Sequence, residues 1–222
     1  VQEHLDGSLG VGSIPIDETN KCLFGALDID DYNLDLPVLF AKVKRFKLPL
    51  VLCRSKSGGA HLYLFMSDKV AASEMRDRLA EFASVLGWGN CEIFPKQEEL
   101  LAERGDVGNF INLPYQNAKY TTRYALKKNG ESFSLEDFLT MAEKSQITAK
   151  QLSNISLGGD NGVLPDGPPC LQKLTEFGIP EGGRNMTLLN VGVYYKQASP
   201  NDWKELLEKH NQDYCTPPLP AR

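Results

Sequence analysis

The sequence predicts an α+β protein in which a split βαβ (RRM-like) sheet carries helices and is followed by a small all-α domain. Between residues 23 and 94, short apolar runs and amphipathic helix patterns alternate in the order β-α-β-β-α-β. Residues 154–169 are rich in Gly, Pro, Asn and Asp, which predicts a linker. We therefore expect a first domain at 1–153 and a helical domain at 170–222.

Hydrophobic spacing defines the first half of the predicted sheet. Residues 23–30 form an apolar run that ends in acidic residues, which indicates a buried strand. Apolar residues at helical spacing predict a helix over 35–46. Two further apolar runs predict strands at 50–53 and 61–65, and a Ser-Gly-Gly turn lies between them.

The second half of the sheet follows from the same reasoning. An amphipathic pattern predicts a helix over 69–86, with Gly87 as its stop signal. Apolar runs predict strands at 91–94 and 110–113, and Ser134 begins a further helix with a capping pattern. In the usual order of such a sheet, the first strand lies between the third and the fourth and is antiparallel to both.

Beyond the linker the sequence has only helical patterns. The predicted helices cover 171–177, 186–196 and 202–210.

Composition excludes several classes of protein. The sequence has 41% hydrophobic and 24% charged residues, and it contains neither an apolar run of ~20 residues nor a signal peptide. We therefore expect no membrane partner and a cytoplasmic location in a bacterial or archaeal cell. A net charge of −5 argues against a simple nucleic-acid-coating protein, which is usually basic. The five scattered cysteines form no C-x-x-C pair, which favours free thiols over a zinc site. We expect Cys22, Cys53 and Cys91 to be small core residues.

Acidic residues follow the first predicted strand. Asp28 and Asp30 are two positions apart, so on a strand they share a face, where their charges repel unless a cation binds between them. Oxygen ligands of this kind suit Mg²⁺ or Mn²⁺. The expected strand order brings Glu92 to the same end of the sheet. The alternative for these acids is an exposed strand end that faces water.

The turn before residues 61–65 has the composition of a phosphate-binding loop. Gly58 and Gly59 allow the backbone to approach a ligand closely, and successive N–H groups in such a turn form an anion-binding nest. The side chains that add donors are Arg54, Lys56, Ser57 and His61. The alternative is an ordinary glycine hairpin with a surface histidine.

The order of these motifs resembles the archaeo-eukaryotic primase superfamily, in particular the primase-polymerases of phages, plasmids and mobile elements. Its pattern is an apolar strand ending in Asp-x-Asp, then a Ser/His motif, then an apolar residue and an acid. The matching segments here are 24–30, 57–65 and 91–92. Residues 4–16, and 92–97 with 108–115, are similar to the branch found in conflict systems and phages, and 181–185 is similar to the helical domain that follows many such primases.

Two positions depart from the superfamily pattern. Glu92 stands where many relatives have Asp, which gives the acid a longer arm. Many relatives have Ser two residues before the His, whereas this chain has Gly59, so Ser57 must serve instead.

The resemblance implies a DNA-dependent primase-polymerase that uses two Mg²⁺ or Mn²⁺ ions held by Asp28, Asp30 and Glu92. The implied catalytic residues are Asp28, Asp30, Glu92 and His61. The implied nucleotide-binding residues are Arg54, Lys56, Ser57, Gly58, Gly59, His61, Lys96 and Asn109. In the helical domain, Arg184 and Asn185 would contact the template or the initiating nucleotide. The implied partners are a single-stranded DNA template, NTPs or dNTPs, and a helicase beyond Arg222.

Two other functions fit the same sheet. One is a non-catalytic module that binds single-stranded nucleic acid, because His61, Tyr63 and Phe65 alternate on one face and could stack bases. The Lys/Arg-Gly-Phe signature of such modules is missing, and acids beside a stacking surface would repel phosphate. The other is an inactive relative that serves as a scaffold, against which the intact acids argue.

Overall fold

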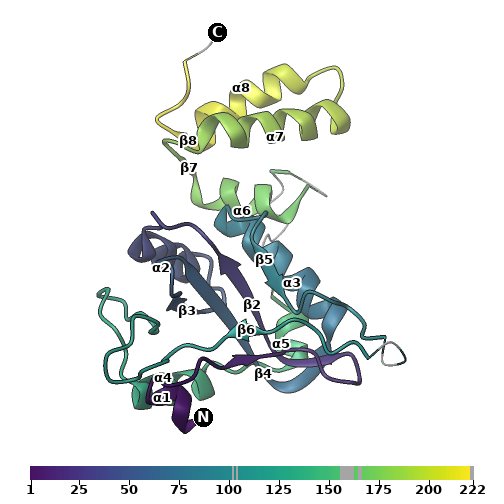
Figure 1. Cartoon of the computed structure of the whole chain (residues 1–222). Coiled ribbons are helices and arrows are strands. Elements are labelled where there is room, and N and C mark those ends of the chain that lie inside the picture. The colour runs from purple at the N-terminus through teal and green to yellow at the C-terminus, as the bar shows by residue number, and fades with distance from the viewer. Residues whose placement is uncertain (102, 104, 156–162, 165–166, 221–222) are drawn as a thin grey trace. The chain divides into compact units, whose positions relative to one another are not determined.

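The chain forms two compact units, Val1–Ile155 and Ser156–Arg222, shown in the computed structural model of Figure 1. The structure describes residues 1–101, 103, 105–155, 163–164 and 167–220. Much of the predicted linker at 154–169 lies outside the described residues.

The first unit is built on a four-stranded antiparallel sheet in the order β3-β4-β2-β5. Strand β2 (Lys21–Ile29) lies between β4 (Ala60–Ala71) and β5 (Glu92–Phe94) and pairs antiparallel with both. Strand β3 (Val51–Arg54) pairs with the other side of β4. The predicted strand order, with the first sheet strand in the middle, is therefore confirmed.

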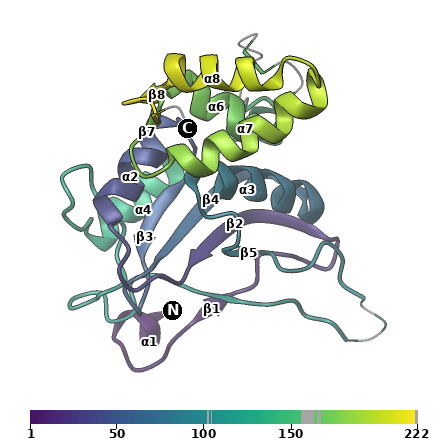
Figure 2. The same ribbon diagram turned by 90° about the horizontal axis from the view of Figure 1, so that it is seen from above.

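Two helices lie side by side on one face of this sheet, α2 (Leu36–Arg45) and α3 (Ala72–Leu86) (Figure 2). Gly25 of β2 allows α3 to pack closely, because a Cβ atom at this position would lie 2.6 Å from the Met75 sulfur and 2.8 Å from Leu79. The order β-α-β-β-α-β and the α+β class are confirmed.

Segments from both ends of the unit cover the opposite face of the sheet. One is a two-stranded ribbon of β1 (Gly12–Ser13) and β6 (Ile111–Asn112). Another is α4 (Leu135–Lys144), whose Phe138 joins Tyr63 in the buried core. On this face the sheet is apolar except toward the end of β2, where polar residues replace apolar ones.

Some boundaries differ from the prediction because backbone pairing extends an element beyond its side-chain pattern. Residues 69–71 continue β4, since Ala71 pairs with Lys21, and α3 starts only at Ala72. The helices α1 (Gln2–Leu5) and α5 (Ala149–Ser153) were not predicted, because four or five residues are too few to show a helical period.

The second unit contains three helices near the predicted ranges, α6 (Pro169–Phe177), α7 (Arg184–Ala198) and α8 (Trp203–Tyr214). Helices α7 and α8 pack side by side. A short parallel pair of β7 (Ile179–Pro180) and β8 (Cys215–Thr216) was not predicted. A strand of two residues is too short to show the alternation of apolar and polar residues from which strands are predicted.

A single buried histidine links the helices of the second unit. His210 on α8 is 1% exposed, and its two ring nitrogens each lie 3.2 Å from a hydroxyl oxygen, Oγ1 of Thr175 on α6 and the phenol of Tyr195 on α7. Burial lowers the pKa of His210 from 6.5 to about 4. The ring is therefore neutral at physiological pH, and charging it opposes folding.

Two expectations from composition can be compared with the structure. Within the described residues, none of the helices has the length and apolar character needed to cross a membrane. All five cysteines are free, and Cys22 and Cys53 are buried as predicted.

We predict that acid destabilises the second unit through His210. The unfolded histidine binds a proton below pH ~6.5 and the folded one only near pH 4, so the free energy of unfolding falls as pH drops across this window and is unaffected above it. Trp88→Phe leaves Trp203 as the fluorescent probe of this unit. In that background, the melting temperature is measured at pH 4.5 and at pH 7.5. The difference between the two values should be clearly smaller in His210→Gln than in the protein that retains His210. An equal pH difference in both proteins would contradict the assignment.

Candidate active site

One row across the sheet carries the polar residues of the site. Asp28 on β2 is directly opposite His61 on β4 and Glu92 on β5, and His61 is opposite Cys53 on β3. Residues in register on neighbouring strands project to the same face, so these four form what we call the polar row. The next row toward the centre of the sheet is apolar and consists of Val51, Tyr63, Ala26 and Phe94.

His61 is held by a relay of hydrogen bonds. The Tyr63 hydroxyl donates to the carbonyl oxygen of Asn112 at 2.9 Å and lies 3.1 Å from Nδ1 of His61. Burial raises the pKa of Tyr63 well above its usual value, so the phenol keeps its one proton. Because that proton is donated to Asn112, Nδ1 of His61 must donate to the Tyr63 oxygen. The neutral ring then has its lone pair on Nε2.

Asp28 faces that lone pair. Its Oδ1 lies 3.3 Å from Nε2 of His61, yet it is buried and forms no hydrogen bond with any of the described residues. Two acceptors at this distance need a proton or a cation between them, because an unsatisfied buried carboxylate oxygen is costly. A proton on Nε2 or a bound metal ion would satisfy Oδ1.

The three predicted metal ligands line one pocket of about 430 Å³. Asp28, Asp30 and Glu92 share it with residues 87–91 of the loop between α3 and β5. Their carboxylate oxygens and the unsatisfied Oδ1 of Asp28 fit a hard divalent cation. Within the described residues, however, no three His, Cys, Asp or Glu side chains are gathered closely enough to hold a metal ion.

Glu92 is directed to a lysine rather than to the other acids. Its Oε1 pairs with Nζ of Lys96 at 2.9 Å, and its side chain is about half exposed. The extra methylene that distinguishes Glu from Asp gives this carboxylate a longer reach. A rotation of the exposed side chain would be needed to bring Glu92 to Asp28, and Lys96 would then lose its partner.

The glycine turn packs against the end of β2. A Cβ atom on Gly59 would lie 2.1 Å from the carbonyl oxygen of Ile29, so only glycine fits this close approach. Gly58 has φ +103°, a conformation that favours glycine. The turn is closed by a hydrogen bond from the Ser55 N–H to the Gly59 carbonyl at 2.9 Å. This contact brings the predicted phosphate loop beside Asp28 and Asp30.

The donors around this turn differ in how they are held. Ser57 and Ser55 have hydroxyl oxygens 3.2 Å apart, and Lys56 is exposed. Arg54 donates from Nη1 to the carbonyl oxygen of Thr122 at 2.9 Å. Lys56 and Ser57 are thus the side chains of the turn that are exposed to a ligand.

Of the remaining predicted site residues, Asn109 and Arg184 have structural partners. Asn109 hydrogen-bonds Gln97 through both its side chain and its backbone N–H. In the second unit, Arg184 donates to the Pro217 carbonyl and pairs with Glu181 at 3.0 Å, while Asn185 is exposed. Contact of these residues with nucleotide or template stays a prediction.

Several residues of the site were not predicted from the sequence. Tyr63 fixes His61 and Ser55 closes the turn, but an aromatic residue in a strand and a serine in a turn carry no distinguishing signal. Cys91 was expected in the core, which was wrong: it is only half-buried, because it precedes β5 and lines the pocket of Asp28. Burial raises the pKa of Cys91 to about 11, and the charges of Asp28 and Glu92 add to the shift.

Comparison with known proteins agrees with this geometry. A family described as the archaeo-eukaryotic primase domain of TOTE conflict systems matches residues 1–155, which are the first unit and contain the polar row. No curated protein matches the chain. Members of this superfamily are generally nucleotidyltransferases, and such domains generally use divalent metal ions. The chain belongs to the archaeo-eukaryotic primase domains of TOTE conflict systems.

Proposed function

We propose that the chain is a DNA-dependent primase-polymerase that makes primers, extends DNA, or does both on a single-stranded template. Its substrates would be NTPs or dNTPs. It would act in the replication of a phage or mobile element, or in the conflict system after which the family is named. A helicase beyond Arg222 is a proposed partner. The observation that carries the proposal is the polar row, which puts two acids and a histidine on adjacent strands beside a glycine turn.

The acids are the proposed holders of divalent ions. Asp28 and Asp30 project from the end of one strand, and Glu92 reaches the same pocket from the next strand. Bound Mg²⁺ or Mn²⁺ would supply charge stabilisation for an attacking hydroxyl, the α-phosphate and the leaving pyrophosphate. Lys96 would be released from Glu92 in this arrangement, and its ammonium group could then pair with a phosphate.

His61 is proposed to bind the triphosphate. Since Nδ1 is committed to Tyr63, the ring has only Nε2 with which to reach a ligand. With a second proton on Nε2, the ring would be an imidazolium. It would donate a hydrogen bond from Nε2 to a phosphate oxygen and place a positive charge beside it. The backbone of Gly58 and Gly59, with Ser57 and Lys56, would contribute further donors.

Burial of Tyr63 argues against the non-catalytic binding module. Tyr63 is 2% exposed in a core that also includes Tyr115 and Phe138, and its ring stacks on the partly buried Phe65 at 5.8 Å. A base cannot stack on a ring that is already covered. The acids of the polar row also repel phosphate, so this face favours catalysis with cations over base stacking.

We predict that Asp28→Asn and Asp30→Asn each lower primer extension at least ~100-fold. Losing a metal ligand removes several kcal/mol of transition-state stabilisation, and ~2.7 kcal/mol already corresponds to a factor of ~100. Asp31→Asn is the matched control, because Asp31 caps a neighbouring turn and does not line this pocket. Rates are measured with labelled nucleotide in Mg²⁺ and in Mn²⁺, and melting temperatures confirm folding. Activity of a folded Asp28→Asn within tenfold of the control would exclude the ligand assignment.

Tyr63→Phe should raise the KM for the incoming nucleotide several-fold with a smaller effect on kcat. The substitution removes the acceptor of the Nδ1 proton, so His61 is no longer held in one orientation and one tautomer. Tyr115→Phe is the control, because Tyr115 is also a buried tyrosine with hydrogen bonds but has none to His61. If both variants have the same KM, Tyr63 serves only packing.

We expect a shortened chain that ends at Ile155 to lose unprimed synthesis far more than primer extension. The first unit has its own core, and ending after Ile155 keeps the carbonyl that accepts from Arg78. Starting a primer requires two free nucleotides to be fixed on a single strand, which has the larger entropic cost. Both activities are compared on the same template with and without a primer. Equal losses would mean that the second unit supports general stability or template affinity instead.

A further inference from the structure

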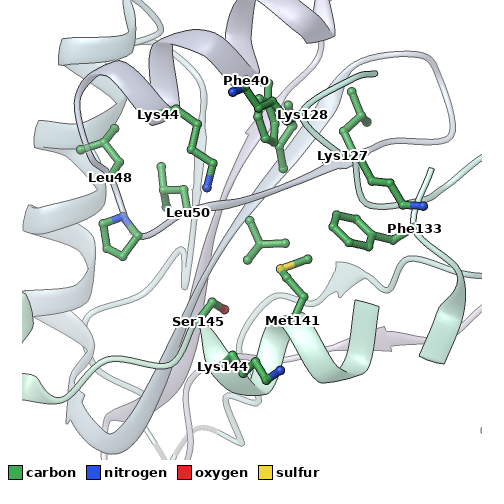
Figure 3. Close-up of a pocket in the computed structure, with 14 residues that line it drawn as sticks. Phe40, Lys44, Leu48, Leu50, Lys127, Lys128, Phe133, Met141, Lys144 and Ser145 are labelled. Carbon is green, nitrogen blue, oxygen red and sulfur yellow. The ribbon is translucent and has the colours of Figure 1, made fainter. Parts of the chain in front are cut away.

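A second pocket of about 530 Å³ lies at the β3 edge of the sheet, away from the polar row (Figure 3). Helix α2 contributes one wall and α4 another, and a third consists of Leu126, Lys127, Lys128 and Phe133. The floor consists of Leu50, Val51 and Leu52, which are buried. Helices α2 and α4 pack on opposite faces of the sheet, so the pocket opens where the sheet ends.

Four lysines line this pocket, and none of its lining residues is acidic. Lys44 comes from α2 and Lys144 from α4. Lys127 and Lys128 come from the segment that precedes α4. None of the four belongs to any ion pair formed by the described residues. Such a concentration of unpaired positive charge, in a chain with a net charge of −5, fits a ligand with more than one phosphate.

Aromatic rings accompany two of the lysines. The ammonium of Lys44 lies 5.4 Å from the ring centre of Phe40, and that of Lys127 lies 5.5 Å from the ring centre of Phe133. Two of the three walls therefore combine a flat apolar ring with a cation that lies over one face of that ring. A nucleotide has the same combination, because its base is flat and its phosphate is charged.

The pocket lies within reach of a strand bound at the polar row. Strand β3 is two strands away from β2, which is about 10 Å across the sheet. Leu50 is three residues from Cys53, which is about 10 Å along the strand direction. The separation is then about 14 Å, which about four stacked nucleotides cover at 3.4 Å each. A single strand that leaves the catalytic face over this edge would meet the lysines.

We propose that this pocket binds single-stranded nucleic acid, with one unpaired base in the hollow between Phe40 and Phe133 and the flanking phosphates on the four lysines. The inference rests on the proposed function, because the strand would be the template. It assigns template binding to a surface separate from the metal and triphosphate site. A free nucleotide shares the same chemistry and is distinguished in the test.

The test measures binding of the full chain to a fluorescent 12-nucleotide oligothymidylate, without metal or nucleotide, by anisotropy over a range of salt. Lys127→Gln with Lys144→Gln should weaken binding about tenfold and reduce the salt slope by about 1.4, because two phosphate contacts are lost. Lys21→Gln with Lys150→Gln removes the same charge at the start of β2 and on α5, and should change the affinity less than twofold. Equal weakening in the two double variants would overturn the proposal.

A second measurement tests the base. The native chain should bind the oligothymidylate more tightly than an abasic 12-mer with the same phosphates, and Phe133→Leu should abolish that difference while its melting temperature stays near native. Persistence of the preference in folded Phe133→Leu would overturn base binding in the hollow. If labelled dTMP bound as tightly as the 12-mer, the pocket would be a free-nucleotide site and the strand proposal would fail. Because no synthesis is needed, a chain that binds DNA here but makes no product would contradict the proposed function alone.

Discussion

The antiparallel pairing of β2 with β4 and β5 is the constraint on which the site depends. Its register puts Asp28 opposite both His61 and Glu92. A slip of one residue along β2 would turn Asp28 into the apolar face under α3 and bring Ile29 into its place. Burial of Leu27 and Ile29 on the helix side opposes such a slip, so the hydrophobic core sets the geometry of the acids.

The same pairing explains why the polar row lies beside a glycine turn. Because β2 and β4 are antiparallel, the end of β2 meets the start of β4, and the turn before β4 must pass close to Ile29. Only a residue without a side chain fits there, as the 2.1 Å approach at Gly59 shows. The donors of this turn are therefore neighbours of Asp28 and Asp30 through backbone geometry, although 24 or more positions separate them along the chain.

Charge is distributed unevenly over the first unit. The acids gather at the end of β2, where they repel a nucleic acid unless cations are bound, and unpaired lysines gather at the β3 edge. Under the proposed function, this separation explains how a chain with a net negative charge could act on a nucleic acid. A template held by the lysines at the edge would not have to contact the acids except through metal ions and nucleotide.

The sequence by itself determined the α+β class and the order β-α-β-β-α-β, because hydrophobic period and turn residues are local properties, and it predicted Asp28, His61 and Glu92 as site residues. Register and side-chain partners were decided only by tertiary structure. Tyr63 was expected to alternate with His61 on one face, but its bond to Asn112 depends on a segment 49 residues away. The pocket of four lysines likewise depends on how segments distant in the sequence pack together. The pairing of Glu92 with Lys96 is local, but it depends on the rotamers of two long side chains, which no residue pattern encodes.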